Sequence, residues 1–515
     1  MKYILLLTSF LCFSFLHSQN IKSCGGIEAE GPYQLVQLPD SGFVIQGFTR
    51  SYGPNNQNTY TIRTNSNGDT LWTMALGNGN DGGVDVLHDS QYIYLLNSTV
   101  SFGPGACDIE KRDFNGNLAW AYGYTGSQIM VPTFFCDGLN GNKLVLGYDN
   151  VSTPPYNTIV AMMIDSGGNV LWYRRIGGNK WEYSGDVKRC NDGGFIVCGN
   201  TSSFNNASNN APDAFLLRLD ANGDSLWMKR YEIAPYQMGA SSVLALPDGG
   251  FALAGAQNKF TAGVEDLYLV RTDSIGDTLW TRTYGGPGPD YGTKLLLMPD
   301  SGFLISAQSA SFAPGNNWEI YLLRTDMNGD TLWTATIGGL DHDVPRDIIH
   351  THNGGVAILA QSASWNASGI YQDYDAALIM FDSTITGACI NGPTATTVGR
   401  CPFIVASCSP MFDTTVNAVR SVHTPFGTSG GTPTSWCNPL SVTQPQASAG
   451  VVFFPNPADD HVYFSSPVQS VSIRDVHGRT VLTEQSTTAI DITAFAPGLY
   501  FITADGLTKK LIIAR

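Results

Sequence analysis

A unit of roughly fifty residues recurs along most of this chain, and six of its copies end in a strand that carries a tryptophan. Successive tryptophans lie 48, 52, 55, 53 and 53 residues apart. They are Trp72, Trp120, Trp172, Trp227, Trp280 and Trp333. A fixed period of this length, filled with short strands, is typical of a β-propeller in which each repeat forms one four-stranded blade.

Two tight turns divide each unit into four strands. The first precedes a Gly-Phe strand, as in Asp300-Ser301-Gly302-Phe303, and the second is exemplified by Asn328-Gly329-Asp330. Glycine accepts positive φ in such turns, and an Asp or Asn side chain bonds the backbone two residues on. The residues between the turns alternate with a period of two, which indicates strands. Because the tryptophans occupy six equivalent positions, we expect them to pack between blades rather than to stack on a sugar ligand.

The seventh unit, residues 342–390, lacks a tryptophan strand of its own. Residues 21–26 match the end of such a strand, as in residues 281–286. We therefore expect the N-terminal segment to complete blade seven, which would remove exposed strand edges. The predicted fold class is all-β: a seven-bladed β-propeller of four-stranded blades over residues 20–390, followed by a small C-terminal β-sandwich-like domain.

The N-terminal end and the charge of the chain indicate export. Residues 1–19 are typical of a signal peptide, with Lys2 before a short apolar run; a membrane anchor is the less favoured alternative. The net charge of −15 and the sequence pI of about 4.8 argue against a nucleic-acid partner and against docking on anionic lipid. No later stretch has the length needed to cross a bilayer, so we expect a secreted or surface-attached protein without a transmembrane span.

Residues 391–450 are rich in Thr, Ser, Pro and Gly, and we expect a linker there rather than a blade. Ten cysteines are present, one of them in the leader, and in an exported protein some are expected to be paired. The spacing of the cysteines alone does not determine which of them form disulfides. Cys389 and Cys437, which bracket the linker, are the first disulfide candidate. Further candidates are Cys401 with Cys408, and Cys190 with Cys198, which flank a turn.

Residues 451–515 form a separate strand-rich module with several short motifs. These are a Pro-Asn-Pro opening, a strand ending in Asp-x-x-Gly-Arg, a Gly-Leu-Tyr strand and a basic-apolar end. The motif residues are Pro455, Asn456, Pro457, Gly478, Gly498, Tyr500 and Lys510. In this order the motifs resemble the type A C-terminal sorting domain of cargo proteins recognised by the type IX secretion system of Bacteroidota.

That resemblance implies a route and partners for the protein. The leader would direct passage through the inner membrane, and the tail would direct transport across the outer membrane by the type IX machinery. The tail of such proteins is commonly removed, and the cargo is released or attached to surface lipopolysaccharide. An immunoglobulin-like binding module is the alternative interpretation of the tail.

Acidic residues recur thirteen positions before the Gly-Phe turn in four units. They are Glu30, Glu182, Asp290 and Asp343. If the first strand of each blade lines the channel, these acids would ring one mouth and could hold a cation such as calcium. We favour the alternative that each acid caps the turn that enters its own blade. No other cofactor is expected.

Other patterns carry less weight. Residues 427–431 fit the Gly-x-Ser-x-Gly elbow of serine hydrolases, with His423 nearby, but no helix follows. Residues 341–343 with His350 and His352 are the densest group of metal-ligand types, yet they belong to the ordinary first strand of blade seven. Asp-Thr-Leu and Asp-Ser-Leu triplets resemble an O-glycosylation acceptor pattern, and the repeat itself is the simpler explanation.

No catalytic constellation stands out. The loops vary between units, for example residues 51–58 and 203–212, and such loops on a rigid scaffold are where recognition usually resides. The leading hypothesis is a non-catalytic propeller that binds an extracellular glycan or protein, or that serves as a structural module. The alternatives are an exported glycan-active enzyme, with carboxylates roughly 5–10 Å apart around the channel, and a passive surface component.

Overall fold

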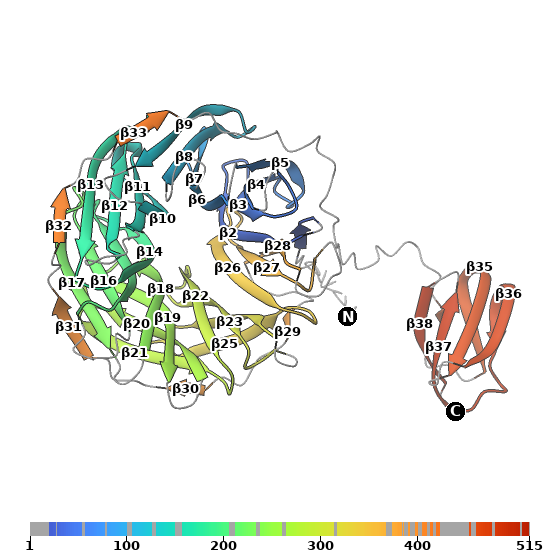
Figure 1. The fold of residues 1–515 in the computed structure, drawn as a ribbon. Coiled ribbons are helices and arrows are strands. Elements are labelled where there is room, and N and C mark those ends of the chain that lie inside the picture. Colours follow the sequence, from blue (N-terminus) through green and yellow to red (C-terminus); the bar gives the residue numbers. More distant parts are fainter. Residues whose placement is uncertain are drawn as a thin grey trace, which may run out of the picture. The chain divides into compact units, whose positions relative to one another are not determined.

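The computed structural model divides the chain into two compact units, Met1–Leu440 and Ser441–Arg515 (Figure 1). It describes residues 20–385 except for the segments 27, 54–56, 78–79, 100–105, 126–129, 150–156, 205–211, 233–236, 260–263, 314–316, 367–372 and 384. It also describes five short strands between residues 390 and 422, and residues 453–454, 460–475, 479–504 and 507–513.

The first unit is a ring of seven antiparallel sheets, each built from four strands (Figure 1). From blade one to blade seven the strands are β2 (Glu30–Gln37), β3 (Phe43–Thr49), β4 (Asn58–Thr64), β5 (Thr70–Leu76); β6 (Gly82–His88), β7 (Tyr92–Thr99), β8 (Ala106–Asp113), β9 (Leu118–Thr125); β10 (Met130–Asp137), β11 (Lys143–Asp149), β12 (Ile159–Ile164), β13 (Val170–Gly177); β14 (Glu182–Arg189), β15 (Phe195–Thr201), β16 (Asp213–Leu219), β17 (Ser225–Glu232); β18 (Gln237–Ala245), β19 (Phe251–Lys259), β20 (Val264–Thr272), β21 (Thr278–Gly285); β22 (Asp290–Leu297), β23 (Phe303–Ser309), β24 (Glu319–Thr325), β25 (Thr331–Ile337); β26 (Asp343–His350), β27 (Val356–Ser362), β28 (Asp375–Phe381) and β1 (Asn20–Cys24).

Blade seven contains both ends of the propeller sequence. Strand β1 pairs antiparallel with β28, from Asn20 opposite Met380 to Cys24 opposite Ala376. The first strand of the described chain is therefore the outermost strand of the last blade. The ring is closed by backbone hydrogen bonds rather than by packing alone.

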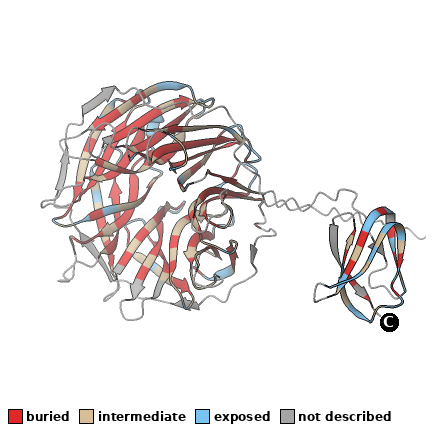
Figure 2. Ribbon diagram, turned by 45° about the vertical axis from the view of Figure 1, so that its right-hand side comes forward, coloured by how far each residue is buried: buried red, intermediate tan, exposed pale blue. Residues whose placement is uncertain are grey.

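The hydrophobic core lies between neighbouring blades, where the strand interiors are buried (Figure 2). One cluster joins Leu144 and Ile159 of blade three to Phe195 and Phe215 of blade four. A single four-stranded sheet cannot cover both of its faces, so stacking neighbours supplies the missing contacts. This arrangement explains why middle strands such as β4, β16 and β24 are buried along their whole length.

The first turn of the repeat is held by an arginine from the third strand. In blade four, Asp192 accepts a hydrogen bond from the Gly194 N–H at 3.1 Å and forms an ion pair with Arg218. The other guanidinium nitrogen of Arg218 donates to the Phe195 carbonyl at 3.2 Å. The same contacts recur in blades one, five and six through Arg63, Arg271 and Arg324.

The outer strands of several blades contact the second turn of the next blade. The indole N–H of Trp72 donates to the Phe114 carbonyl at 3.2 Å, and the hydroxyl of Tyr231 donates to the Gly276 carbonyl at 2.6 Å. Gly223 has a φ of +81°, and a Cβ atom at this position would lie only 2.5 Å from the ring of Trp172. The half-buried tryptophans therefore pack between blades, and the turn needs glycine for both its conformation and its close contact.

The segment after the propeller departs from the expected linker. Five short strands follow one another as β29 (Ile390–Asn391), β30 (Thr397–Gly399), β31 (Ile404–Cys408), β32 (Phe412–Thr415) and β33 (Val419–Val422). They pair with the outer strands of blades six, five, four, three and two in that order. We call these five strands the belt. The interpretation of residues 391–450 as a linker outside the blades is thus corrected for the belt.

The outer edge of a blade explains how such a segment can pair. An edge strand offers a row of backbone N–H and C=O groups that any extended segment can satisfy, whatever its side chains. Threonine-rich sequence has good β-propensity, so the belt needs no apolar alternation to form strands. The composition that suggested a linker is therefore also compatible with a fifth strand.

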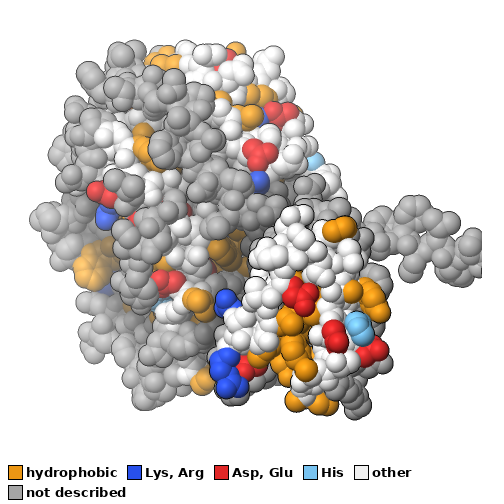
Figure 3. Space-filling model, turned by 90° about the vertical axis from the view of Figure 1, so that its right-hand side faces the viewer, with side chains coloured by type: hydrophobic (Ala, Val, Ile, Leu, Met, Phe, Trp, Pro, Cys, Tyr) orange, Lys and Arg blue, Asp and Glu red, His pale blue; other side chains and the backbone are white. Residues whose placement is uncertain are grey.

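The second unit is a five-stranded antiparallel sheet. Its strands are β34 (Phe453–Phe454), β35 (His461–Asp475), β36 (Thr480–Asp491), β37 (Gly498–Ala504) and β38 (Leu507–Ile513). The long strand β35 pairs with β34, β36 and β37. One apolar cluster includes the fully buried Ile473 and Leu511, whereas Tyr463, Val481 and Phe501 are 46%, 41% and 41% exposed. Figure 3 shows hydrophobic side chains on the surface of this unit.

The motif residues of this unit are only partly within the described chain. Gly498 opens β37, and the Tyr500 hydroxyl donates to the Ala496 carbonyl at 3.0 Å. The backbone of Lys510 pairs with Phe501. Pro455, Asn456, Pro457 and Gly478 lie outside the described residues.

The cysteines of the blades do not form the disulfide considered from their spacing. Cys190 and Cys198 are both free thiols. In the hairpin register Cys198 lies opposite Asp186, because Arg189 already pairs with Phe195. Cys389, Cys401 and Cys437 lie outside the described residues, and the structure describes only the backbone of Cys408.

Candidate functional site

Each of the seven innermost strands carries a β-bulge at the same place. One residue is inserted there relative to the second strand of the blade. The inserted residues are Tyr33, Val84, Thr133, Gly185, Ser241, Thr293 and Arg346. A bulge turns a side chain away from the regular alternation of its strand. All seven residues line one cavity of about 560 Å³.

The rest of the cavity wall is mostly polar and uncharged. It includes the side chains of Gln34, Gln57, Asn80, Ser98 and Ser184. The cations Lys294 and Arg346 and the ring of Phe134 complete the functional groups, and none of the lining residues in the described chain is Asp or Glu. The wall therefore offers hydrogen bonds and positive charge, but no carboxylate.

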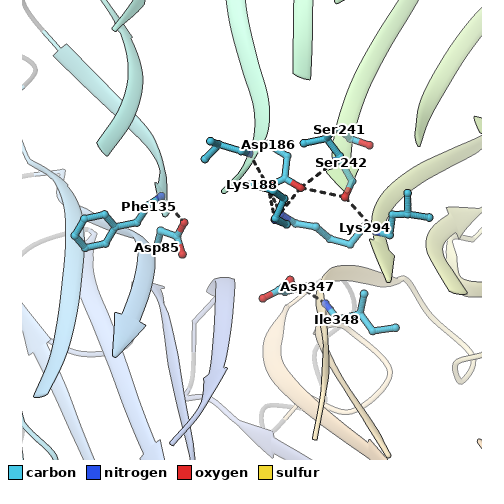
Figure 4. A network of polar contacts seen from close by, with 12 residues as sticks. Asp85, Phe135, Asp186, Lys188, Ser241, Ser242, Lys294, Asp347 and Ile348 are labelled. Carbon is cyan, nitrogen blue, oxygen red and sulfur yellow. Dashed lines mark hydrogen bonds and ion pairs between the residues drawn. The ribbon is translucent and has the colours of Figure 1, made fainter. Parts of the chain in front are cut away.

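Neighbouring blades are tied together directly after the bulges. Asp85 accepts a hydrogen bond from the Phe135 N–H of the next blade at 2.7 Å, and Asp347 accepts one from the Leu35 N–H at 3.0 Å. Ser242 accepts from the Leu295 N–H at 3.2 Å in the same way. Figure 4 shows these polar side chains around the axis, contributed by different blades.

Asp186 is the centre of the charged contacts in this network. Its carboxylate lies 2.9 and 3.1 Å from the Lys188 ammonium and 3.8 Å from the Lys294 ammonium, and it also accepts from the Val243 N–H at 3.2 Å (Figure 4). Burial opposes ionisation, but the two lysines hold the pKa of Asp186 below its ordinary value. Asp186 is therefore the ionised acid of the network.

The other two acids of the network behave differently. Burial raises the pKa of Asp85 to about 7, and burial also raises the pKa of Asp347. Both side chains use one oxygen for a backbone N–H of the next blade and the other for their own strand, at Val86 and Ile348. These contacts give both acids a structural role.

The four acids singled out from the sequence are fully buried at the starts of inner strands. Glu182 accepts from the Gly178 N–H at 3.1 Å and from the Thr201 hydroxyl at 3.0 Å. Equivalent contacts to a backbone N–H four residues earlier hold Glu30, Asp290 and Asp343. The structure thus places each acid as a cap for the loop that enters its own blade, and none of them lines the cavity.

The histidines of blade seven are spread over different contacts. His350 contacts the Leu297 carbonyl at 2.9 Å, His342 accepts from the Trp318 N–H at 3.1 Å, and the His352 N–H donates to Gln37. Within the described residues no three His, Cys, Asp or Glu side chains come together as metal ligands. The Gly-x-Ser-x-Gly pattern at residues 427–431 and His423 lie outside the described residues.

Sequence reasoning missed the bulged residues that line the cavity. In six of the seven units they stand ten positions before the first residue of the second strand of the blade, as Thr293 stands before Phe303. The position carries a different residue type in most units, so no shared chemistry drew attention to it. The residue that follows it also differs between units, as Ser242, Lys294 and Asp347 show, so no repeating pattern marked the position.

Three comparisons place the molecule among known proteins. The Regulatory protein FlaEY of Caulobacter vibrioides is 27% identical over 161 residues, covering 27% of this chain and 17% of that protein. The match thus spans about a sixth of that relative. Among solved structures, the polysaccharide lyase Uly1 is 12% identical with a TM-score of 0.44, covering 70% of this chain and 90% of the other. Sqt1 of Chaetomium thermophilum is 9% identical with a TM-score of 0.41, covering 70% and 98%.

The C-terminal unit is identified by its sequence family. Residues 452–514 match the model described as Secretion system C-terminal sorting domain. In the described part of the chain, no helix has the length and apolar character required to cross a bilayer. The tail is a type IX secretion sorting domain, and the chain is a cargo protein of that system, secreted or attached at the cell surface.

Proposed function

We propose that the propeller is a non-catalytic binding module whose ligand enters the central cavity. The observation that carries this proposal is the ring of seven bulged residues, one from each blade, around a cavity of about 560 Å³. Small-molecule sites typically have volumes of roughly 300–1,000 Å³ and few, well-placed polar groups. Different side chains on equivalent strands give the cavity an asymmetric pattern of contacts, which suits recognition.

The chemistry of the wall favours binding over hydrolysis. A glycosidase needs two carboxyl groups that face the substrate, whereas the lining residues of the described chain include neither Asp nor Glu. The nearby acids Asp85 and Asp347 are engaged with backbone N–H groups. Serine, threonine, asparagine and glutamine side chains are suited to hydrogen bonds with a hydroxyl-rich ligand.

One observation keeps a glycan-active enzyme as the second candidate. The pKa of Asp85 is about 7, in the range that suits a general acid at neutral pH. Opening the hydrogen bonds that Asp85 makes to Phe135 and Val86 would be required before it could act on a substrate. A chemically altered ligand would therefore favour this candidate.

The place of action follows from the tail. A cargo of the type IX system meets ligands outside the cell, so extracellular glycans and proteins are the proposed ligand classes. We further propose that the tail is removed during export and that the propeller is then attached to surface lipopolysaccharide. A passive surface component would have no use for a patterned cavity.

A binding screen with a cavity-filling variant tests this function. The purified full chain is screened against soluble polysaccharides and glycoproteins, and ligands are examined by mass spectrometry for chemical change. Thr293 lines the cavity and Thr331 is exposed on the outer strand of the same blade. We expect Thr293→Trp to abolish binding and Thr331→Trp to leave it unchanged. Binding that survives Thr293→Trp, or the absence of any ligand, would contradict the proposal.

A further inference from the structure

We propose that Lys294 and Arg346 make the central cavity selective for an anionic saccharide, one that carries carboxylate or sulfate groups. This inference rests on the proposed binding function and adds the chemical class of the ligand. It follows from where the two cations lie, from their partners, and from the groups that surround them.

The two cations lie on the innermost strands of adjacent blades. Lys294 directly follows the bulge of β22 in blade six, and Arg346 is the bulged residue of β26 in blade seven. Both line the cavity, and no Asp or Glu is found among the lining residues that the structure describes. An anion in the cavity would therefore meet two positive charges.

The guanidinium of Arg346 has unused hydrogen-bonding capacity. One terminal nitrogen donates to the Gln361 side-chain oxygen, a neutral acceptor. Its Nε atom is buried and has no hydrogen-bond partner among the described residues. A buried donor without a partner costs about 1–3 kcal/mol, so a ligand acceptor at this position would relieve that cost. Arginine is also the side chain whose planar fork best matches carboxylate and sulfate oxygens.

The ammonium of Lys294 is only loosely engaged by protein. Its nearest acidic atom is an oxygen of Asp186 at 3.8 Å, while Lys188 occupies the same carboxylate at 2.9 and 3.1 Å. The Lys294 ammonium also lies 5.2 Å from the centre of the Phe134 ring. One carboxylate thus serves two lysines, which leaves positive charge available to a ligand.

The remaining acids near the axis reduce this charge only in part. Burial raises the pKa of Asp85 to about 7, so this carboxyl is only partly ionised at neutral pH, and burial also raises the pKa of Asp347. The chain as a whole has a net charge of −15. An anionic ligand is therefore repelled by most of the molecule and attracted at the cavity, which gives selectivity for this site.

The uncharged part of the wall favours a saccharide as the carrier of the anion. Gln34, Gln57, Asn80 and Ser184 line the same cavity with hydroxyl and carboxamide groups, and Tyr33 adds an aromatic ring. Such groups bind the hydroxyls and the apolar faces of sugar rings. A ligand with only a charged group would leave most of these contacts unused.

Calorimetric titration of the full chain with three trisaccharides tests the inference. The probes are trigalacturonate, which is carboxylated, sulfated maltotriose, and neutral maltotriose. We expect at least one charged probe to bind at least about tenfold more tightly than maltotriose, since a hydrogen bond to a charged group contributes about 1.5–3 kcal/mol. Raising the salt from 50 to 500 mM should weaken the charged probes alone. The better charged probe identifies the preferred anion.

Variants assign the effect to the two residues. Lys294→Gln and Arg346→Gln should each weaken the charged probe at least about tenfold, and Arg346→Lys should retain part of the affinity. Lys229→Gln is the matched control, because Lys229 lies on the outer strand of blade four, forms an ion pair with Asp277 of blade five, and is not among the residues that line the cavity. Thermal unfolding of each variant verifies that it is folded.

The outcomes separate this inference from the proposed function. Equal binding of all three probes, or unchanged affinity in both glutamine variants, would overturn the anion selectivity. If neutral maltotriose binds as tightly as the charged probes and Thr293→Trp abolishes that binding, the binding function stands and the ligand class proposed here is wrong. If neither charged probe binds, the inference is overturned, and the wider screen then decides the binding function separately.

Discussion

Buried carboxylates hold neighbouring segments of the propeller together at the scale of single residues. Glu182 and Asp347 are enclosed in protein, and each bonds a backbone N–H outside its own strand. A backbone group that loses such a partner in the interior has no water to replace it. Protonation and substitution of these acids should therefore act directly on stability.

Stability should rise as the pH falls from 8 towards 5. Burial raises the pKa of Glu182 from 4.5 to about 7, so the folded state binds a proton more tightly than the unfolded state does. The stabilisation from this group is fully present below pH 4.5 and is lost as the pH rises through 7. By linkage it amounts to on the order of 3 kcal/mol. Thermal unfolding at several pH values measures the trend.

A glutamine variant isolates the contribution of Glu182. Glu182→Gln keeps a side-chain oxygen for the Gly178 N–H but cannot ionise, so its melting temperature should change less between pH 8 and pH 5. Acids with lowered pKa values, such as Asp192 and Asp300, act in the opposite direction only near and below pH 3.8. An equally steep pH dependence in the variant would show that other groups cause the effect.

Loss of Asp347 should weaken the contact between blade seven and blade one. Asp347→Ala leaves the Leu35 N–H without its acceptor and should lower the free energy of unfolding by about 1–3 kcal/mol. Asp347→Asn retains one oxygen for that bond and should cost less. Urea denaturation of both variants gives the comparison. Equal losses for Ala and Asn would mean that charge, rather than the bond to Leu35, matters.

The residues that cap loops could be predicted from the sequence, whereas those that line the cavity could not. Glu182 and Asp343 share chemistry and position, so alignment of the repeats brings them together. Thr293 and Arg346 share only a position, and a bulge shifts the side-chain direction that strict alternation would assign. The candidate site therefore needed the backbone register.

At the scale of elements, the outer edges of the blades determine where the N-terminal strand and the belt pair. Strand β1 occupies the outer edge of blade seven, and the belt occupies the outer edges of blades two to six. The outer edge of β5 in blade one has no such partner among the described strands. Strand β5 can therefore serve as an internal control for the effect of the belt on the other outer strands.

The belt should protect the outer strands from hydrogen exchange. Strand β31 pairs with β17 from Met228 opposite Cys408 to Glu232 opposite Ile404. Deletion of residues 397–422 should therefore accelerate amide exchange in β17 and β13, measured by mass spectrometry. Exchange in β5 should remain unchanged, because no belt strand pairs with it. Unchanged exchange in β17 would contradict the belt in solution.

The strands of the blades could be predicted because their signals are local. Turn residues and alternation lie within each unit, as at Asn328-Gly329-Asp330. The belt is different, since its strands are short and four of the five pair with residues more than a hundred positions away, as Ile404 does with Glu232. Edge pairing through backbone groups leaves no side-chain pattern from which the sequence could reveal it.

The whole molecule joins two units with separate tasks. The propeller carries the cavity, and residues 452–514 carry the secretion signal. The buried cluster of the C-terminal sheet, which includes Val471 and Ile490, consists only of residues from that unit. Each unit therefore has its own core, and function can be changed in one without rebuilding the other.

Export should depend on the tail and not on the cavity. Deletion of residues 452–514 should leave the chain in the periplasm, because the sorting domain marks cargo for the type IX machinery. Cell fractionation and immunoblotting measure the distribution between periplasm, surface and medium. Thr293→Trp, which fills the cavity without touching the tail, should be exported like the unchanged protein. The two variants change separate units of the chain. If the truncated chain still reached the surface, the export signal would have to lie in the propeller, and this division of tasks would be wrong.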